Sequence, residues 1–255
     1  MRAKKSLGQH FLVDENVLGV IGRLAELRPQ DVVLEVGPGR GVLTRYLAGH
    51  VRVVHAVELD CSLEDSLGEA LAPFDNVRLV YGDALALDLG ALDPPPDKLV
   101  ANLPYNIATP LVLESLERVP TLTRWCVMVQ REVADRFFAS PRTKAYGAVS
   151  VLLQLHARKV GFHPVSPGVF RPRPHVESAL VAFGRVEGPG LPLVRPVVES
   201  AFAHRRKTLV NSIALTGLAT RERVESALAE LGRDAAARAE ELEPREFVAL
   251  AEALR

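Results

Sequence analysis

The stretch Asn102-Leu103-Pro104-Tyr105 carries the groups that could hold a planar base by its exocyclic amine. The amide oxygen of Asn102 can accept one N–H bond, and the backbone carbonyl of Leu103 or Pro104 can accept the other. The ring of Tyr105 offers a face for stacking. Asparagine and proline are also common in plain turns, so these four residues alone fit a turn as well as an amine-binding site.

The position of this stretch along the chain favours a binding site. The apolar segment Lys98–Ala101 predicts a short buried strand, and Pro110 marks a new element beyond the stretch. The four residues therefore lie at the carboxyl end of a strand, which is where ligands bind in open α/β sheets.

A glycine-rich loop, residues 37–41, follows the predicted strand Asp31–Val36 and precedes a helix that begins near Val42. Glycines there let the chain turn sharply and approach a ligand, and the N-terminus of a helix favours an anionic group. The spacing is G-x-G-x-G, whereas a dinucleotide fingerprint needs a third glycine at the position of Val42. The loop by itself fits a structural turn as well as a cofactor site.

Acidic residues lie at the ends of the next two predicted strands, Val51–Leu59 and Val77–Tyr81. Glu58 lies about 20 residues beyond the first glycine of the loop, where a carboxylate can hold the two hydroxyls of a ribose. Asp83 can accept a hydrogen bond from an adenine amino group. Because the carboxyl ends of parallel strands share one edge of a sheet, the loop, both acids and the Asn102–Tyr105 stretch should meet there.

Strand-like and helix-like segments alternate over residues 31–183, which predicts an α/β fold with a mostly parallel sheet covered by helices. The stretch Gly184–Pro192 has linker composition. No strand pattern follows it, and four short helices are expected at Val194–Ala203, Lys207–Leu215, Glu222–Leu231 and Glu246–Leu254. We therefore expect a catalytic domain over residues 1–186 and a small all-α domain over residues 187–255.

The composition of the 255 residues, 48% of them hydrophobic, indicates an ordered globular protein. No apolar run reaches the ~18 residues of a membrane span, and the basic N-terminus lacks a signal-peptide pattern, so a cytoplasmic location is expected. The 2 cysteines are too few for a disulfide framework or a zinc site, and no metal is expected. A formal net charge of +0 argues weakly against a nucleic-acid partner, although basic residues cluster locally.

The whole motif set is similar to that of class I S-adenosylmethionine-dependent methyltransferases, which have a Rossmann-like fold, through residues 35–39, Glu58 and Asp83. The Asn102–Tyr105 stretch resembles the amino-methylating branch of that class. Five more stretches resemble signatures of the small-subunit ribosomal RNA adenine dimethyltransferase family: Lys5–Leu12, Gln130–Ala134, Lys144–Gly147, Phe170–Ser178 and Arg205–Leu209. The resemblance runs in order from about Lys4 to Asn211.

The resemblance implies S-adenosyl-L-methionine as the cofactor and assigns residues to three roles. Cofactor contacts are implied at Gln9, His10, Leu12, Gly37, Gly39, Glu58, Asp83, Ala84 and Asn102. The catalytic set that it implies is Asn102, Leu103, Pro104, Tyr105 and Phe170, with the two rings stacking on opposite faces of the target adenine. Contacts to RNA phosphates are implied at Lys4, Lys5, Arg205, Arg206 and Lys207.

Two of these positions have a competing interpretation. His10 stands where some relatives carry asparagine, and it could be a surface histidine, although both side chains can donate a hydrogen bond. Phenylalanine is most often a core residue, but Pro172 and Pro174 favour a loop at Phe170 over a core strand.

The function implied by the resemblance is N6,N6-dimethylation of two adjacent adenosines near the 3′ end of small-subunit ribosomal RNA. A monomer acting on a pre-30S-type particle, with methylation coupled to subunit assembly, is expected. Three alternatives stay open: dimethylation of large-subunit RNA, as in antibiotic-resistance relatives; a role chiefly as an assembly factor; and a dehydrogenase. Val42 in place of a third glycine, together with the Asn102–Tyr105 stretch, disfavours the dehydrogenase.

Overall fold

The computed structural model describes residues 11–255, and the chain forms two compact units. The first unit contains the residues up to Ala134 together with Lys159–Arg185, and the second contains Asp135–Arg158 and Val186–Arg255. The chain passes between the units three times, and the expected linker contains the third crossing, after Arg185. Asp135–Arg158 groups with the C-terminal helices. The assignment of catalysis to residues 1–186 stays a prediction.

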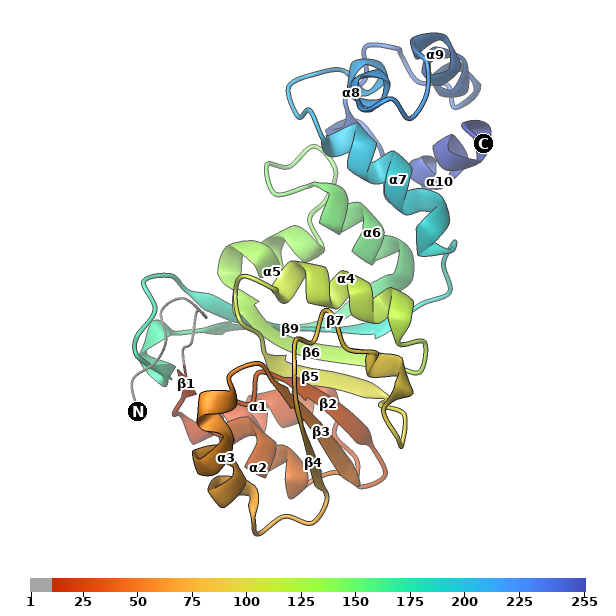
Figure 1. Cartoon of the computed structure of the whole chain (residues 1–255). Helices are drawn as coiled ribbons and strands as arrows, with labels where there is room; N and C mark the ends of the chain where they lie inside the picture. Colours follow the sequence, from red (N-terminus) through yellow and green to blue (C-terminus); the bar gives the residue numbers. More distant parts are fainter. Residues whose placement is uncertain (1–10) are drawn as a thin grey trace. The chain divides into compact units, whose positions relative to one another are not determined.

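A seven-stranded sheet has the order β4-β3-β2-β5-β6-β9-β7 (Figure 1). In that order the strands are Val77–Tyr81, Val53–Glu58, Val32–Val36, Lys98–Asn102, Arg124–Gln130, Ser178–Arg185 and Ala157–Val165. Every pairing from β4 to β6 is parallel, and β9 pairs antiparallel with β6. The predicted mostly parallel sheet is confirmed, and the carboxyl ends of its five parallel strands share one edge.

Helices cover both faces of this sheet. The helices that begin in the first unit are α1 (Glu15–Ala25), α2 (Val42–Ala48), α3 (Glu64–Leu71), α4 (Ala108–Arg118) and α5 (Arg131–Phe137). Trp125 donates from Nε1 to Oγ of Ser115 on α4 at 2.9 Å, while the next residue, Cys126, lies against the carbonyl of Ile21 on α1. Successive side chains of a strand point to opposite faces, so α1 and α4 lie on opposite sides of β6.

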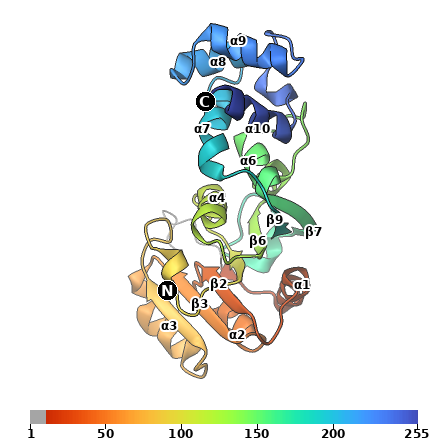
Figure 2. The same cartoon turned by 90° about the vertical axis from the view of Figure 1, so that its right-hand side faces the viewer.

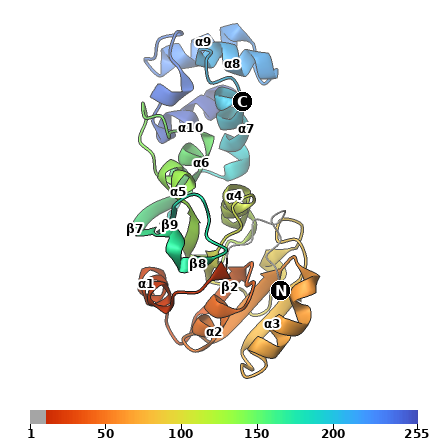
Figure 3. The ribbon, with the colours of Figure 1, turned by 90° about the vertical axis from the view of Figure 1, so that its left-hand side faces the viewer.

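The helix α1 forms where the sequence predicts it. Asp14 accepts the backbone N–H of Asn16 at 2.8 Å, which satisfies one of the unpaired donors at the helix start. Val17, Leu18 and Ile21 are buried on its apolar face and join the main hydrophobic core. Figure 3 shows α1 beside α2. The acidic helix α3 was not predicted, because only Leu67 and Leu71 of its residues are buried and the apolar signal is correspondingly weak.

A two-stranded antiparallel sheet joins distant parts of the first unit. β1 (Phe11–Leu12) pairs with β8 (Phe170–Arg171), with Leu12 opposite Phe170. Both of these side chains belong to the main hydrophobic core. The prediction of a loop at Phe170 is therefore wrong, because burial of its ring and pairing with β1 outweigh the effect of the prolines that follow it.

The second unit is helical, as predicted for the C-terminal residues (Figure 2). Its helices include α6 (Ala148–His156), α7 (Leu191–Phe202), α8 (Leu209–Thr216), α9 (Arg221–Glu230) and α10 (Pro244–Ala253). The buried hydroxyl of Tyr146 donates to the carbonyl of Leu242 at 2.8 Å, which ties the segment before α6 to the segment before α10. Across residues 11–255, the structure contains no helix with the length and apolar character of a membrane span.

Candidate active site

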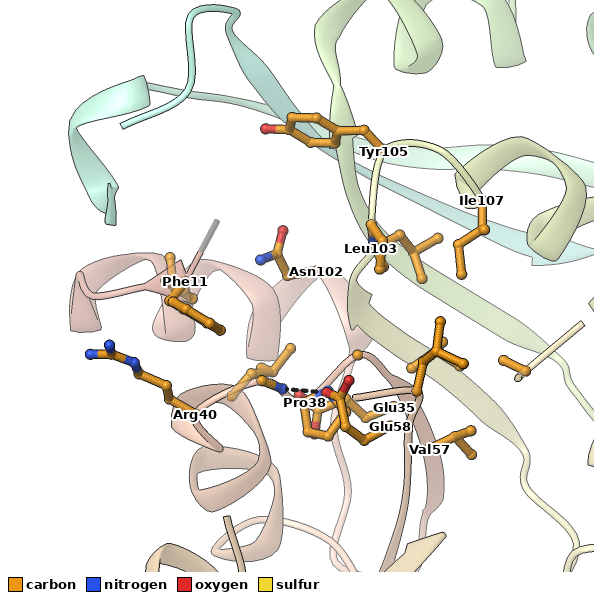
Figure 4. A pocket seen from close by; sticks show the side chains of 18 of the residues that line it. Phe11, Glu35, Pro38, Arg40, Val57, Glu58, Asn102, Leu103, Tyr105 and Ile107 are labelled. Atoms are coloured by element: carbon orange, nitrogen blue, oxygen red, sulfur yellow. Dashed lines mark hydrogen bonds between the residues drawn. The ribbon is translucent and has the colours of Figure 1, made fainter. Parts of the chain in front are cut away.

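A pocket opens at the carboxyl edge of the sheet in the first unit (Figure 4). Its lining comes from β1, from the carboxyl ends of β2, β3 and β5, from the loops after β2, β3, β4 and β5, and from the start of α2. Among the predicted site residues, the lining contains Leu12, Gly37, Gly39, Glu58, Asp83, Ala84, Asn102, Leu103, Pro104 and Tyr105. Segments separated along the chain thus meet at the edge where the motif pattern predicts a site.

The glycine loop fits against the Asn102–Tyr105 stretch. Gly37 has a φ of +76°, in the left-handed region that strongly favours glycine, and its N–H donates to the carbonyl of Val57 at 2.9 Å. A Cβ atom at Gly37 would lie 3.3 Å from Cδ of Pro104. A larger residue here would be strained in backbone and would press on the proline.

Glu58 holds the glycine loop in place. Its Oε2 accepts the N–H of Gly39 at 3.0 Å, and its Oε1 accepts the N–H of Asp60 at 2.9 Å. The side chain is buried at the end of β3 and lines the pocket. The carboxylate therefore organises two loops and also faces the pocket. The sequence predicted a ribose contact at Glu58, but it did not indicate these two backbone contacts.

Asp83 and Ala84 follow β4 and border the same pocket. Oδ1 of Asp83 accepts the N–H of Leu85 at 2.9 Å, which closes a turn directly after the strand. The Asp83 side chain stays exposed at the pocket, whereas Ala84 is buried. This turn sets the direction in which the aspartate faces the pocket.

The Asn102–Tyr105 stretch is both a turn and part of the pocket. Asn102 is the last residue of β5, the N–H of Leu103 donates to the carbonyl of Met128 at 3.0 Å, and the N–H of Ile107 donates to the carbonyl of Pro104 at 3.1 Å. The side chain of Leu103 is buried. Figure 4 places Asn102 between Tyr105 and the glycine loop. A turn and a binding site, the two interpretations that the sequence left open for this stretch, are therefore compatible.

Tyr105 is half-buried and its hydroxyl lies 2.7 Å from Oγ of Ser178. Burial raises the pKa of the Tyr105 phenol above its ordinary value, and the hydrogen bond with Ser178 offsets this in part. The ring therefore stays neutral at physiological pH.

Glu35 lines the pocket but was not among the predicted site residues. It is fully buried in β2, and its Oε2 has no hydrogen-bond partner within the described part of the chain. Burial raises the pKa of this carboxyl to about 8; the Thr44 hydroxyl opposes the shift and the charge of Glu58 adds to it. The group is therefore mostly protonated at neutral pH. The signal that could have identified it is a lone acid in an otherwise apolar strand.

The lining of the pocket contains an aromatic and cationic pair that was also missed. The guanidinium carbon of Arg40 lies 4.9 Å from the centre of the Phe11 ring, and both residues line the pocket. A Cβ atom at Gly39 would lie 2.9 Å from the Phe11 ring. Phe11 lies within one of the matching stretches, but only its pairing with β8 explains its position.

Several predicted site residues are not brought to the pocket. The ring of Phe170 is 0% exposed and belongs to the hydrophobic core, so it presents no stacking face in this structure. Arg205, Arg206 and Lys207 are exposed between α7 and α8 in the second unit. Lys4, Lys5, Gln9 and His10 lie outside the described residues.

Solved structures share this fold. A dimethyladenosine transferase from Plasmodium falciparum superposes with a TM-score of 0.76 at 22% identity, covering 94% of this chain and 96% of that one. The 23S rRNA methyltransferase ErmE superposes with a TM-score of 0.67 at 32% identity, covering 96% and 99%. The predicted Rossmann-like methyltransferase fold is confirmed.

Sequence comparison gives the family. The chain is 51% identical over 251 residues to the ribosomal RNA small subunit methyltransferase A of Rubrobacter xylanophilus, covering 98% of this chain and 94% of the relative. It is 42% identical over 264 residues to the protein of the same name from Geobacter metallireducens, covering 100% and 96%. The family model for ribosomal RNA adenine dimethylase matches residues 1–255. The chain therefore belongs to the ribosomal RNA adenine dimethylase family.

Proposed function

We propose that this chain transfers methyl groups from S-adenosyl-L-methionine to N6 of two adjacent adenosines near the 3′ end of small-subunit ribosomal RNA. Membership of the dimethylase family and 51% identity to a small-subunit enzyme support this substrate. The observation that carries the proposal is the shared pocket, in which the glycine loop and Glu58 lie beside the Asn102–Tyr105 stretch. A methyl donor and an amine acceptor could therefore be bound within one cavity.

The lining of the pocket fits the proposed cofactor. The glycine loop gives backbone access, the Glu58 carboxylate suits ribose hydroxyls, and Asp83 suits an adenine amino group. Leu12, Ala84 and Asn102 complete the proposed contacts on the described residues. When bound, S-adenosylmethionine supplies an electrophilic sulfonium methyl group.

Asn102 and the neighbouring carbonyls would orient the substrate amine. The N6 lone pair of adenine is delocalised into the ring, so acceptors placed out of the ring plane favour the pyramidal amine and make the pair available. The Pro104 carbonyl already accepts from Ile107, which leaves it a second lone pair for the substrate. Fixed acceptors also stabilise the positive charge that develops on N6 during transfer.

The stretch does not need to supply a base. The N6 proton becomes acidic once the methyl group has transferred, and a water molecule can then take it. Tyr105 is suited to stacking, because its phenol stays neutral when its pKa is raised. The target base must be single-stranded or flipped out of a helix to reach this pocket.

Phe170 is a weaker candidate for the opposite stacking face. Its ring would have to leave the hydrophobic core that Leu12 and other residues form around it. Burying a phenylalanine stabilises a protein by roughly 1.5–3 kcal/mol, so this exchange would be costly. The family-based role of Phe170 therefore stays a prediction without support from the geometry.

RNA contacts are proposed at Arg206 and Lys207, with Arg205, Lys4 and Lys5 as further candidates. Arg206 and Lys207 are exposed. Arg205 donates to the carbonyl of Lys144 at 3.2 Å, and its own carbonyl accepts from Arg238, so part of its role is structural.

A ribosomal RNA substrate also supports the expected cytoplasmic location. A monomer bound to a pre-30S-type particle remains the proposed assembly.

The test of the function is transfer of a labelled methyl group to undermethylated small subunits, with mass mapping of the modified adenosines. Substituting Asn102→Ala removes one amine acceptor, and we expect kcat to fall by about 100-fold or more. Asn16→Ala, on the exposed surface of α1, is the matched control and should keep wild-type kcat. Wild-type kcat in the Asn102→Ala enzyme would refute the proposed role of the amide.

Large-subunit RNA is the main competing substrate, because the 23S rRNA methyltransferase ErmE is also similar to 96% of this chain. Its identity of 32% is lower than the 51% shared with the small-subunit enzyme. Offering each subunit separately to the same enzyme decides between them. The dehydrogenase alternative is wrong, since the chain belongs to the dimethylase family.

Coupling to subunit assembly requires a separate measurement. If the chain also serves as an assembly factor, the Asn102→Ala enzyme should bind the particle with wild-type affinity while methylation is lost. Loss of both binding and methylation would argue against an independent assembly role.

A further inference from the structure

The hydroxyl of Tyr105 is anchored outside the pocket. It lies 2.7 Å from Oγ of Ser178, and Ser178 is 1% exposed. Ser178 does not line the pocket, whereas Tyr105 does. A buried hydroxyl without a hydrogen-bond partner costs free energy, so this contact satisfies Ser178 and fixes the far end of the tyrosine ring.

The topology of the sheet explains how a serine from a distant strand reaches this place. Ser178 is the first residue of β9, and it pairs with Gln130 at the end of β6. Because β9 runs antiparallel to β6, its first residue lies at the edge where the parallel strands end. The N–H of Arg131 donates to the carbonyl of Glu177 at 2.9 Å and closes the pairing at that edge.

The tyrosine ring is therefore held at both ends. At the backbone end, Ile107 donates to the Pro104 carbonyl and Leu103 donates to the Met128 carbonyl. At the other end, the hydroxyl contacts Ser178. A side chain held in this way loses little further freedom when a base stacks on it, which favours a productive geometry.

We propose that Ser178 is a positioning residue for methyl transfer, because it holds the Tyr105 ring ready to stack on the target adenine. This inference rests on the proposed stacking role of Tyr105. Ser178 itself touches neither substrate nor cofactor in this proposal, and it acts only through the tyrosine hydroxyl.

The test is a double-mutant cycle measured by methyl transfer to undermethylated small subunits. Ser178→Ala and Tyr105→Phe each remove one partner of the same hydrogen bond, and each should lower kcat by about 2- to 12-fold. The double variant should be no slower than the slower single variant, because both changes remove one interaction. KM for S-adenosylmethionine should stay unchanged in all three enzymes.

Two further variants separate positioning from general stability. Ser178→Thr keeps the hydroxyl and should recover most of the lost kcat. Ser115→Ala is the matched control. Ser115 is also 1% exposed, and its hydroxyl accepts from Trp125 and donates to the carbonyl of Val112, so it has no contact with Tyr105 in these hydrogen bonds. It should lower the Tm without changing kcat at 25 °C.

The outcomes distinguish this inference from the function on which it rests. A Tyr105→Ala enzyme with wild-type kcat would refute the stacking role itself. If Tyr105→Ala is slow but Ser178→Ala has wild-type kcat, the stacking role survives and the positioning role of Ser178 is overturned. Effects of Ser178→Ala and Tyr105→Phe that multiply in the double variant would also overturn it.

Discussion

Single side chains in this pocket combine structural and binding roles. The two oxygens of Glu58 accept N–H groups from Gly39 and Asp60, and the same carboxylate faces the pocket. An amide at this position could not accept in both directions, since its nitrogen only donates. A carboxylate is therefore needed at position 58 to accept both backbone N–H groups, whether or not a ligand is bound.

Glu35 makes stability depend on pH. Its folded-state pKa of about 8 lies above the ordinary value of 4.5, so the folded protein binds the proton more tightly than the unfolded chain. The resulting stability is present below pH 4.5 and is lost as pH rises toward about 8. Within the described residues, no hydrogen-bond donor contacts Oε2 of Glu35, so no such bond on this oxygen stabilises the ionised carboxylate in the folded state.

We expect Glu35→Gln to remove this dependence. The free energy of unfolding of the variant, relative to wild type, should rise by about 1.4 kcal/mol per pH unit between pH 5.5 and 7.5. Urea denaturation at several pH values measures it. Glu69→Gln on the exposed face of α3 is the control and should give a difference that does not change with pH. A constant difference for Glu35→Gln as well would contradict the assignment.

At the scale of elements, one arginine joins the end of a helix to the sheet. Arg185, the last residue of β9, donates to the carbonyls of Leu122, Leu116 and Val119 at 2.6, 3.0 and 3.0 Å. Its guanidinium carbon lies 5.1 Å from the centre of the Trp125 ring. The Arg185 guanidinium thus donates hydrogen bonds both to the end of α4 and to the segment after it. The helix α4 begins shortly after the Asn102–Tyr105 stretch.

Substituting Arg185→Lys should destabilise the first unit by about 1–3 kcal/mol, because a lysine ammonium cannot reproduce the planar fork or its stacking. Thermal or urea unfolding measures the loss. Arg78→Lys on the exposed face of β4 makes the same chemical change without this network and should leave stability nearly unchanged. Equal stability of the two variants would show that the three carbonyl contacts contribute little.

At the scale of the whole molecule, the pocket and the proposed phosphate contacts belong to different units. The pocket belongs to the first unit, and the exposed Arg206 and Lys207 belong to the second. A formal net charge of +0 for the whole chain hides this local cluster. Nucleic-acid binding by such a protein depends on where its cations lie, and its total charge is a poor guide.

Replacing Arg206 or Lys207 by alanine should weaken binding to small-subunit RNA and reduce the slope of log affinity against log salt by about 1 for each lost phosphate contact. Filter binding at several salt concentrations measures the slope. Arg245→Ala, an exposed arginine on α10, removes the same charge within the second unit and serves as the control. A slope that Arg206→Ala leaves unchanged would exclude Arg206 from the phosphate contacts.

Local sequence was sufficient for the elements whose signals are short-range. Alternating apolar segments and glycine, proline and capping residues placed the parallel strands, α1 and the C-terminal helices, because these depend on neighbours along the chain. Parallel order then implied that Gly37, Glu58, Asp83 and Asn102 share one edge of the sheet, and all four line one pocket.

Only the tertiary structure decided the features that depend on distant partners. Pairing of β1 with β8 buries Phe170, where local prolines predict a loop. Burial within the sheet raises the pKa of Glu35, and the sequence around this glutamate does not indicate a raised pKa. The antiparallel course of β9 brings Ser178 to Tyr105, 73 positions away along the chain. Each of these outcomes depends on packing between segments that no local pattern relates.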